Sequence, residues 1–204
     1  MKNNRIAFAA AAFALAVPFA SAAQSTTPAC DAALNTAAPK VRLTTSMGPI
    51  VLQLDREKAP LSTENFVKYV GSGHYDGTVF HRVIDNFMVQ GGGFDKDMRE
   101  KPTRGKIKNE ASNGLKNDAY TVAMARTNEY DSATSQFFIN SKANDFLNYQ
   151  GPNTGYAVFG KVVEGRETVD KIRKVAVQQT RYSEATPNEA VLITKAECIA
   201  PAAK

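Results

Sequence analysis

The chain has 204 residues, of which 43% are hydrophobic, 9% aromatic and 22% charged, a balance typical of one globular domain and unlike that of a disordered or collagen-like chain. It contains two cysteines and two histidines, too few for a structural zinc site or a disulfide-rich scaffold. The basic residues behind the formal charge of +5 are scattered, without the clustered patch that a nucleic-acid-binding surface needs.

Residues 1–23 have the composition of a signal peptide. A short positively charged start precedes an alanine-rich apolar stretch over residues 6–20, which is shorter than the roughly 20 apolar residues of a membrane-spanning helix. Small residues follow this stretch, so we expect cleavage near Ala22 or Ala23. The sequence therefore predicts export to the periplasm, with secretion as the alternative and no membrane association after cleavage.

A leader, a domain and a short tail follow the signal peptide. Residues 24–40 are rich in alanine, threonine and proline, which predicts a flexible leader; the domain covers residues 41–199 and the tail 200–204. The leader contains Cys30, and the last apolar run contains Cys198. If the first and last strands pair antiparallel, the two cysteines come within bridging distance. In an oxidising compartment we therefore expect a disulfide between them, with two unrelated thiols as the alternative.

Alternation of apolar and polar side chains predicts eight short strands. In the first, Val41, Leu43 and Thr45 point to one side. A turn at residues 46–49 leads into a second strand, and the two make a hairpin. The expected strands cover residues 41–45, 50–54, 78–84, 87–90, 120–125, 135–140, 157–163 and 191–196.

Two segments have helical spacing. The first covers residues 60–71, with a proline suited to the first turn and a glycine suited to the stop. The second covers residues 167–175, with Val169, Ile172 and Ala176 on one side. The pattern predicts a mainly β fold, a closed eight-stranded antiparallel β-barrel capped by two α-helices, because closure removes the exposed edges of such a sheet.

Three motif-like patterns have simpler structural interpretations. Residues 155–161 match the start of a phosphate-binding loop, but Val162 stands where that loop needs serine or threonine for magnesium. No helical pattern follows the glycine run at residues 91–93, which favours a turn or a close backbone approach over an anion cradle. His81 has no accompanying nucleophile-elbow motif and is interpreted as structural. We expect no metal and no other cofactor.

One short region brings together groups that fit a binding site. If residues 85–86 form a hairpin turn, Met88 and Gln90 share one face and Arg82 projects from the neighbouring strand. Further along the chain, Phe138 lies in a strand that is apolar on both faces. Each of these residues alone fits an ordinary core or surface position, and together they indicate a site.

Three blocks of sequence resemble the cyclophilin family, and in particular its exported bacterial members. They are FHRVIDNFMVQGG, MARTNEYDSATSQFFIN and YAVFGKVVEG, at residues 80–92, 124–140 and 156–165. The similarity extends over residues 41–199. The resemblance implies an eight-stranded antiparallel barrel with two capping helices, peptidyl-prolyl cis-trans isomerase activity, a site on the outer surface of the barrel and no cofactor.

The resemblance also implies roles for individual residues. Arg82 matches the catalytic arginine, Gln90 matches a polar side chain that contacts the substrate near the twisting bond, and Gln136 falls in the same groove. The residues that match the proline pocket are Phe87, Met88, Phe138 and Leu147, and those that match the stretch along the substrate backbone are Ala125, Arg126 and Thr127.

Three positions depart from the usual pattern of the family. Arg126 stands where asparagine is common, which should keep the main-chain contacts and change the preference for residues that flank proline. Phe146 and Tyr156, at the rim of the predicted pocket, replace a tryptophan and a histidine of many eukaryotic members. Because phenylalanine lacks the N–H donor of an indole ring, we expect cyclosporin to bind less tightly.

The predicted function is to accelerate X-Pro bond rotation in unfolded or folding exported proteins, with proline-containing polypeptides as partners. Arg82 is expected to donate a hydrogen bond to the prolyl nitrogen of the twisted transition state above the apolar pocket. We expect a monomer that does not bind nucleic acid. The alternatives are a module that binds proline-containing chains without turnover and, less favoured, a hydrolase built on His81.

Overall fold

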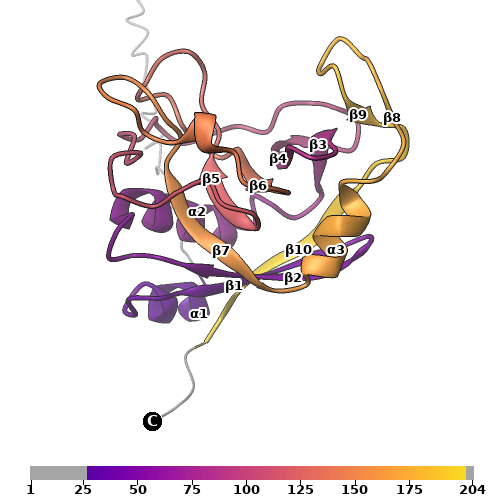
Figure 1. Cartoon of the computed structure of the whole chain (residues 1–204). Coiled ribbons are helices and arrows are strands. Elements are labelled where there is room, and N and C mark those ends of the chain that lie inside the picture. The colour runs from indigo at the N-terminus through magenta and orange to yellow at the C-terminus, as the bar shows by residue number, and fades with distance from the viewer. Residues whose placement is uncertain (1–26, 201–204) are drawn as a thin grey trace, which may run out of the picture.

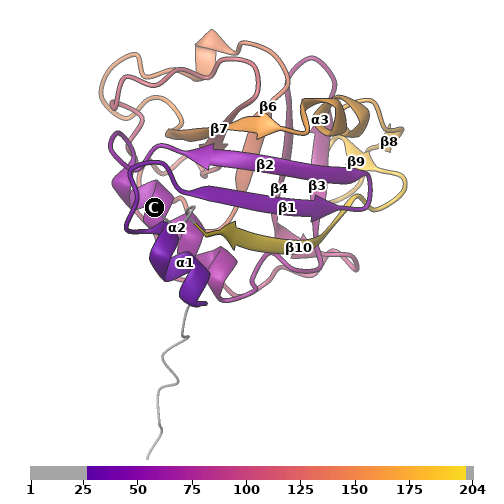
Figure 2. The same cartoon turned by 90° about the horizontal axis from the view of Figure 1, so that it is seen from below.

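Antiparallel strands close into an eight-stranded barrel. Figures 1 and 2 show how the helices lie around it. The computed structural model describes residues 27–200, so the predicted signal peptide and most of the predicted tail lie outside the described residues. The order around the barrel is β1-β10-β3-β4-β6-β5-β7-β2, which confirms the predicted fold. Its strands are β1 (Lys40–Thr45), β2 (Gly48–Leu54), β3 (Thr78–Ile84), β4 (Met88–Asp95), β5 (Thr121–Met124), β6 (Phe137–Asn140), β7 (Val158–Glu164) and β10 (Leu192–Ile199).

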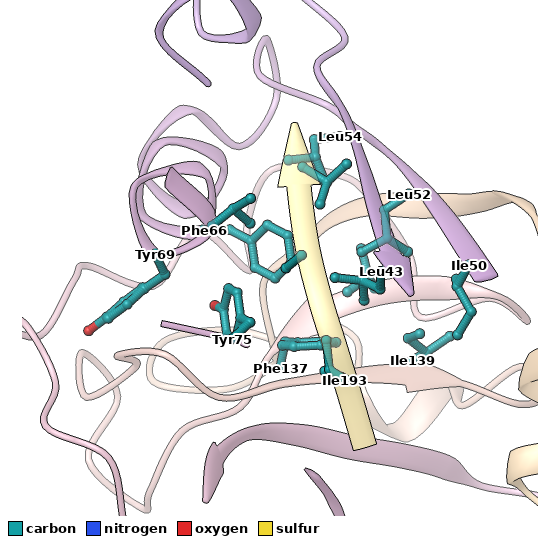
Figure 3. Packing of buried hydrophobic residues seen from close by; sticks show 14 of the residues in the cluster. Leu43, Ile50, Leu52, Leu54, Phe66, Tyr69, Tyr75, Phe137, Ile139 and Ile193 are labelled. Carbon is teal, nitrogen blue, oxygen red and sulfur yellow. The ribbon is translucent and has the colours of Figure 1, made fainter. Parts of the chain in front are cut away.

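Alternation along the strands fills the barrel with apolar side chains. In β1, Val41 and Leu43 are buried while Arg42 between them is exposed. Leu43 belongs to one cluster with Ile50 of β2 and Ile139 of β6 (Figure 3). The period of two read from the sequence thus corresponds to the inner and outer sides of the barrel wall.

Helix α2 (Pro60–Gly71) packs against the barrel and has the predicted bounds. Near its start, the backbone N–H and the hydroxyl of Ser62 donate hydrogen bonds to the Glu110 carboxylate at 2.8 and 2.7 Å, which satisfies a donor that the helix leaves free. The ring of Phe66 is buried, with its centre 5.2 Å from that of Phe137 (Figure 3). This contact joins the helix to the barrel core.

The second predicted helix is shorter than its spacing suggested. Helix α3 (Arg166–Ile172) ends before the predicted boundary, and Ala176, predicted on its apolar side, is exposed. The chain instead enters β8 (Val177–Gln178), which pairs with β9 (Thr186–Pro187) outside the barrel. The sequence did not predict this small sheet, because strands of two residues show no alternation.

Helix α1 (Pro28–Ala33) lies in the segment predicted as a flexible leader, in addition to the two predicted helices. Cys30 and Ala33, one helical turn apart, are 0% and 1% exposed. The predicted disulfide is confirmed: Cys30 is bonded to Cys198 of β10, with Cα atoms 5.1 Å apart and a sequence separation of 168. From residue 27 the leader is therefore packed on the barrel (Figure 2). No helix within residues 27–200 is long and apolar enough to cross a membrane.

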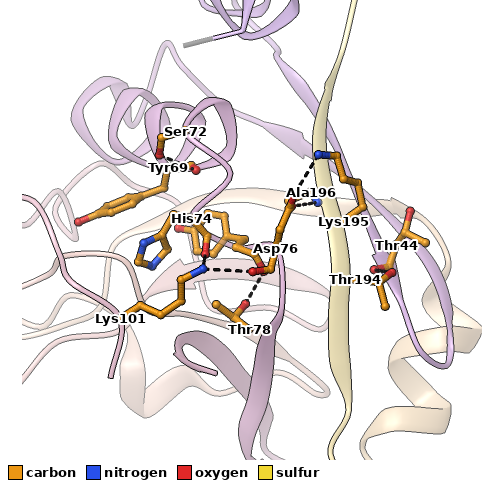
Figure 4. A network of polar contacts seen from close by, with 11 residues as sticks. Thr44, Tyr69, Ser72, His74, Asp76, Thr78, Lys101, Thr194, Lys195 and Ala196 are labelled. Carbon is orange, nitrogen blue, oxygen red and sulfur yellow. Dashed lines mark hydrogen bonds and ion pairs between the residues drawn. The ribbon is translucent and has the colours of Figure 1, made fainter. Parts of the chain in front are cut away.

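Side-chain contacts extend the seam between β3 and β10, whose strand pairing is short. The carboxylate of Asp76, which precedes β3, accepts hydrogen bonds from the backbone N–H of Ala196 and from Nζ of Lys195, both at 2.8 Å (Figure 4). Nζ of Lys101 donates to the backbone carbonyls of His74 and Asp76. These contacts anchor the chain where it enters β3.

Reduction of the disulfide between Cys30 and Cys198 should lower the free energy of unfolding by a few kcal/mol, at most about 5 kcal/mol on the chain-entropy model, because the bond closes a very long loop. Urea unfolding with and without a reductant measures this difference. A Cys30→Ala, Cys198→Ala double variant is the control and should not respond to the reductant. Equal midpoints for the oxidised and reduced wild-type protein would contradict the expectation.

Candidate active site

The strand wall that encloses the core is apolar on its outer side as well. In β6, Phe137 and Ile139 belong to the core cluster, whereas Phe138 between them packs with Met88 of β4 and with Leu147 in a second, separate cluster. This outer cluster forms the floor of a hollow of about 130 Å³. The hollow thus shares its wall with the barrel core.

Each residue that lines this hollow is one of the predicted site residues. They are Arg82, Phe87, Met88, Gln90, Ala125, Arg126, Phe138, Leu147 and Tyr156. The remaining predicted residues, Thr127, Gln136 and Phe146, are not part of the lining. A larger groove, of about 360 Å³, contains none of the predicted residues and runs along β2 and β7.

Arg82 projects from β3 directly opposite Gln90 of β4. Its Nη1 lies 3.4 Å from Oε1 of Gln90 and 3.9 Å from the sulfur of Met88. Its Cζ lies 5.8 Å from the centre of the Phe87 ring. One edge of the guanidinium therefore faces the residues of the hollow.

Glu184, which the sequence analysis did not identify, holds the other edge of the guanidinium. Nε and Nη2 of Arg82 both donate to Oε1 of Glu184, at 2.9 and 2.6 Å. Hydrogen bonding from Arg82, assisted by its positive charge, lowers the pKa of the Glu184 carboxyl, so the pair persists into acidic solution. Glu184 lies in the loop between β8 and β9, 102 residues after its partner, and no local pattern relates the two.

Gln136 extends the polar side of the site from Gln90. Nε2 of Gln90 donates to Oε1 of Gln136 at 2.9 Å. Gln136 lies so close to β4 that a Cβ at Gly93 would come within 2.6 Å of its side chain. The glycine run at residues 91–93 thus permits a close approach, the interpretation that its sequence context favoured over an anion cradle.

Tyr156 and Arg126 form part of the rim. The Tyr156 ring meets the Phe138 ring edge-on, with centres 5.7 Å apart. The Arg126 guanidinium lies over Tyr156, with Cζ 4.7 Å from the ring centre. Thr127 instead stabilises the adjoining loop, where its N–H and hydroxyl bond to the Ser132 hydroxyl at 3.0 and 2.8 Å.

Phe146 extends the apolar surface outside the hollow. It is 66% exposed, and its ring is stacked on that of Phe87, with centres 5.6 Å apart and planes at 26°. It belongs to the 3-10 turn η1 (Asp145–Leu147), which also supplies Leu147 to the hollow. Beside the hollow, the protein thus exposes an aromatic surface that has no N–H donor.

A chain of buried asparagines, also missed by the sequence analysis, supports two lining residues. Nδ2 of Asn144 donates to the backbone carbonyl of Phe87 at 2.9 Å and to Oδ1 of Asn140 at 2.7 Å. Asn140 donates to Oδ1 of Asn117 at 3.2 Å, and Asn117 donates to the carbonyl of Leu147 at 3.1 Å. The network therefore fixes Phe87 and Leu147 relative to β6.

Comparison with known proteins identifies the family to which the chain belongs. The family model described as cyclophilin type peptidyl-prolyl cis-trans isomerase/CLD matches residues 40–198. The chain belongs to the cyclophilin family. Over 78% of its length it is 56% identical to peptidyl-prolyl cis-trans isomerase cyp18 of Streptomyces antibioticus, of which it covers 98%. Over 80% of its length it is 54% identical to peptidyl-prolyl cis-trans isomerase A of Dickeya dadantii, of which it covers 86%. This cyclophilin is accordingly a peptidyl-prolyl cis-trans isomerase.

Solved structures share the fold. A crystal structure of a cyclophilin type peptidyl-prolyl cis-trans isomerase from Cryptosporidium parvum matches this cyclophilin with a TM-score of 0.67 and 24% sequence identity, over 80% of this chain and 99% of that chain. At this level of identity the likeness shows the cyclophilin fold alone.

His81, the candidate base of a hydrolase, is buried in the wall of this cyclophilin. It is 4% exposed, its ring lies 4.7 Å from that of Phe94, and its Nδ1 has no hydrogen-bond partner within the described part of the chain. Burial, with a smaller effect from the charge of Arg82, lowers its pKa to about 4. Because a general base has to reach its substrate, this position fits a structural histidine.

Asn144→Ala should lower the free energy of unfolding by roughly 1 to 3 kcal/mol and raise the KM for an X-Pro peptide. It leaves Oδ1 of Asn140 without a donor and removes one of the two hydrogen bonds to the Phe87 carbonyl, which keeps the one from the backbone N–H of Ser141. Urea unfolding and a protease-coupled assay measure the two effects. Asn35→Ala, at an exposed position, is the control and should change stability by less than about 0.5 kcal/mol. Equal effects of the two substitutions would contradict a supporting role for the network.

The stability of the protein should fall between pH 6.5 and 4 partly through His81. The pKa of His81 is near 6.5 in the unfolded chain and about 4 in the folded chain. The contribution of neutral His81 to the free energy of unfolding is therefore complete above pH 6.5 and lost below pH 4. The loss should be about 3 kcal/mol at most. His81→Phe removes the titration and keeps a ring against Phe94, so its unfolding midpoint in urea should fall less between pH 7 and pH 4. Parallel losses in the two proteins would disprove this assignment.

Proposed function

We propose that this isomerase acts through a hydrogen bond from Nη1 of Arg82 to the prolyl nitrogen of the substrate. Resonance opposes rotation of the peptide C–N bond, with a barrier of about 18 to 20 kcal/mol. As the bond twists, the nitrogen regains a lone pair and becomes an acceptor, so the donor stabilises the twisted state more than the planar one. No covalent bond forms or breaks, and the step needs no nucleophile.

The observation that carries the proposal is the division of donors on the guanidinium. Glu184 engages Nε and Nη2 of Arg82, while Nη1 makes long contacts of 3.4 and 3.9 Å at the hollow. Nη1 can therefore donate to a new acceptor above the apolar floor and gives up only these long contacts. Because the ion pair orients the group before the substrate arrives, little reorganisation is needed in the reaction.

The hydrogen bond from Arg82 and the apolar hollow together account for the size of the required acceleration. Uncatalysed X-Pro isomerisation takes about 10 to 100 s, and turnover within milliseconds requires a roughly 10⁴- to 10⁵-fold acceleration, about 5.5 to 7 kcal/mol. One preorganised donor supplies about 3 to 4 kcal/mol. The hollow supplies the remainder, because it holds the proline ring while the preceding carbonyl swings and excludes water from the planar amide.

Proline-containing segments of exported proteins, folding in the periplasm, are the substrates that we propose for the monomeric enzyme. The composition of residues 1–23 supports export, and the disulfide between Cys30 and Cys198 suits an oxidising compartment. The exposed ring of Phe146 beside the hollow suits an extended chain. A mature N-terminus near Gln24 in the periplasmic fraction would support the assignment, and a full-length chain confined to the cytoplasm would contradict it.

Arg82→Ala should keep its fold and lose about 10²- to 10³-fold in turnover, measured by a chymotrypsin-coupled assay on an X-Pro peptide. Arg82→Lys keeps the charge without the planar donor set and should lose nearly as much. Glu184→Gln weakens the orienting contact and should lose about two- to fivefold.

Arg181→Ala is the matched control and should leave turnover unchanged. Arg181 is an exposed arginine in the loop that carries Glu184, and its side chain contacts Tyr182. Near wild-type turnover in folded Arg82→Ala would overturn the mechanism. A protein that binds the peptide and leaves its slow phase unchanged would instead be a binding module.

A further inference from the structure

Arg126 is held firmly at the rim of the hollow. Its Nε donates to the carbonyl of Gly155 at 3.0 Å, and its Nη1 donates to the carbonyl of Thr127 at 2.9 Å. The guanidinium also lies against two rings, with Cζ 4.7 Å from the centre of Tyr156 and 5.7 Å from that of Tyr130. These four contacts fix a long side chain that would otherwise lose considerable conformational freedom on binding a ligand.

The positive charge at this position is not compensated. Carbonyls and rings orient a guanidinium without neutralising it, and no carboxylate in residues 27–200 forms an ion pair with Arg126. The acids nearest in sequence have other partners: Glu129 pairs with Lys106 at 2.5 Å, and Asp131 accepts from the backbone N–H of Asn109 at 2.8 Å.

The other arginine of the hollow differs in this respect. Arg82 is paired with Glu184 at 2.6 Å, so its charge is largely balanced within the protein. Arg126 and Lys108 also line one narrow crevice. Lys108 is exposed and forms no ion pair in the described chain. The rim near Arg126 is therefore the part of the hollow where positive charge is not balanced by a carboxylate.

The proposed position of the proline brings its flanking residues near this rim. With a proline ring on the floor of the hollow, the flanking residues leave it over the surrounding side chains, Arg126 among them. A carboxylate on a flanking residue would find a guanidinium already oriented, so the ion pair would form with little loss of side-chain entropy from the enzyme.

We propose that Arg126 is a specificity-determining residue that favours substrates with an aspartate or glutamate next to, or two residues from, the proline. The inference rests on the proposed placement of the proline in the hollow. An ion pair at a half-exposed site contributes about 0.2 to 1 kcal/mol, a preference of about 1.4- to fivefold in kcat/KM. A lysine at the same substrate position is disfavoured by like charge.

The test compares peptides that differ at one position, with glutamate, glutamine or lysine before or after the proline. A chymotrypsin-coupled assay serves for positions before proline, and NMR exchange spectroscopy serves for the position after it. At low salt, the kcat/KM for the glutamate peptide should exceed that for its glutamine counterpart by about 1.4- to fivefold at one position at least. The ratio should approach one at ~1 M salt, where the screening length is about 3 Å.

The variant Arg126→Gln should reduce the ratio to about one at low salt. Arg166→Gln is the matched control, because Arg166 is an exposed arginine that also lies over a tyrosine ring, 5.1 Å from the centre of Tyr120, and lines no part of the hollow. It removes the same charge and should leave the ratio at the wild-type value.

The proposal is overturned if the wild-type enzyme gives a glutamate-to-glutamine ratio of kcat/KM equal to one at every peptide position. It is also overturned if folded Arg126→Gln keeps the wild-type ratio. The wild-type ratio and its salt dependence decide the matter even if Arg126→Gln does not fold. Failure of the Arg82 mechanism is distinguishable from failure of this proposal. It would appear as unchanged turnover of Arg82→Ala on every peptide, whatever residue flanks the proline. The residual activity of Arg82→Ala should keep the glutamate preference.

Discussion

One wall of strands with apolar side chains on both sides is the constraint on which this cyclophilin depends. Side chains alternate along a strand, so the neighbours Phe137 and Phe138 of β6 belong to the core and to the outer cluster respectively. The core fixes the backbone, and the backbone in turn fixes the floor of the hollow. Since protein cores are packed nearly as densely as organic crystals, the shape of this floor is set by the fold and needs no ligand to form.

Loops between the barrel strands supply groups that orient the residues of the site. Glu184, in the loop between β8 and β9, orients Arg82, and buried asparagines join Phe87 and Leu147 to β6. The two arginines of the hollow consequently have different electrostatic surroundings. The paired one suits chemistry at the prolyl nitrogen, and the unpaired one suits recognition of neighbouring residues.

The strands and the lining residues could be predicted because their signals are local. Alternation gives the strands, and three continuous sequence blocks carry all the residues of the hollow except Leu147. Glu184 could not be found this way, because its contact with Arg82 joins positions 102 residues apart. Helix α1 has six residues, too few for a clear pattern, and the disulfide and β10 stabilise it. At Ala176 the helical spacing was misleading, because the pairing of β8 with β9 draws the chain away from α3.

The position of β10 determines when the barrel can be completed. This last strand lies between β1 and β3, so the sheet keeps an open edge until the C-terminal part of the chain has emerged from the ribosome and inserted. Cys198 lies near the end of β10, which places it beside Cys30 after insertion. The disulfide therefore joins two segments that the fold brings together only once β10 has taken its place between β1 and β3.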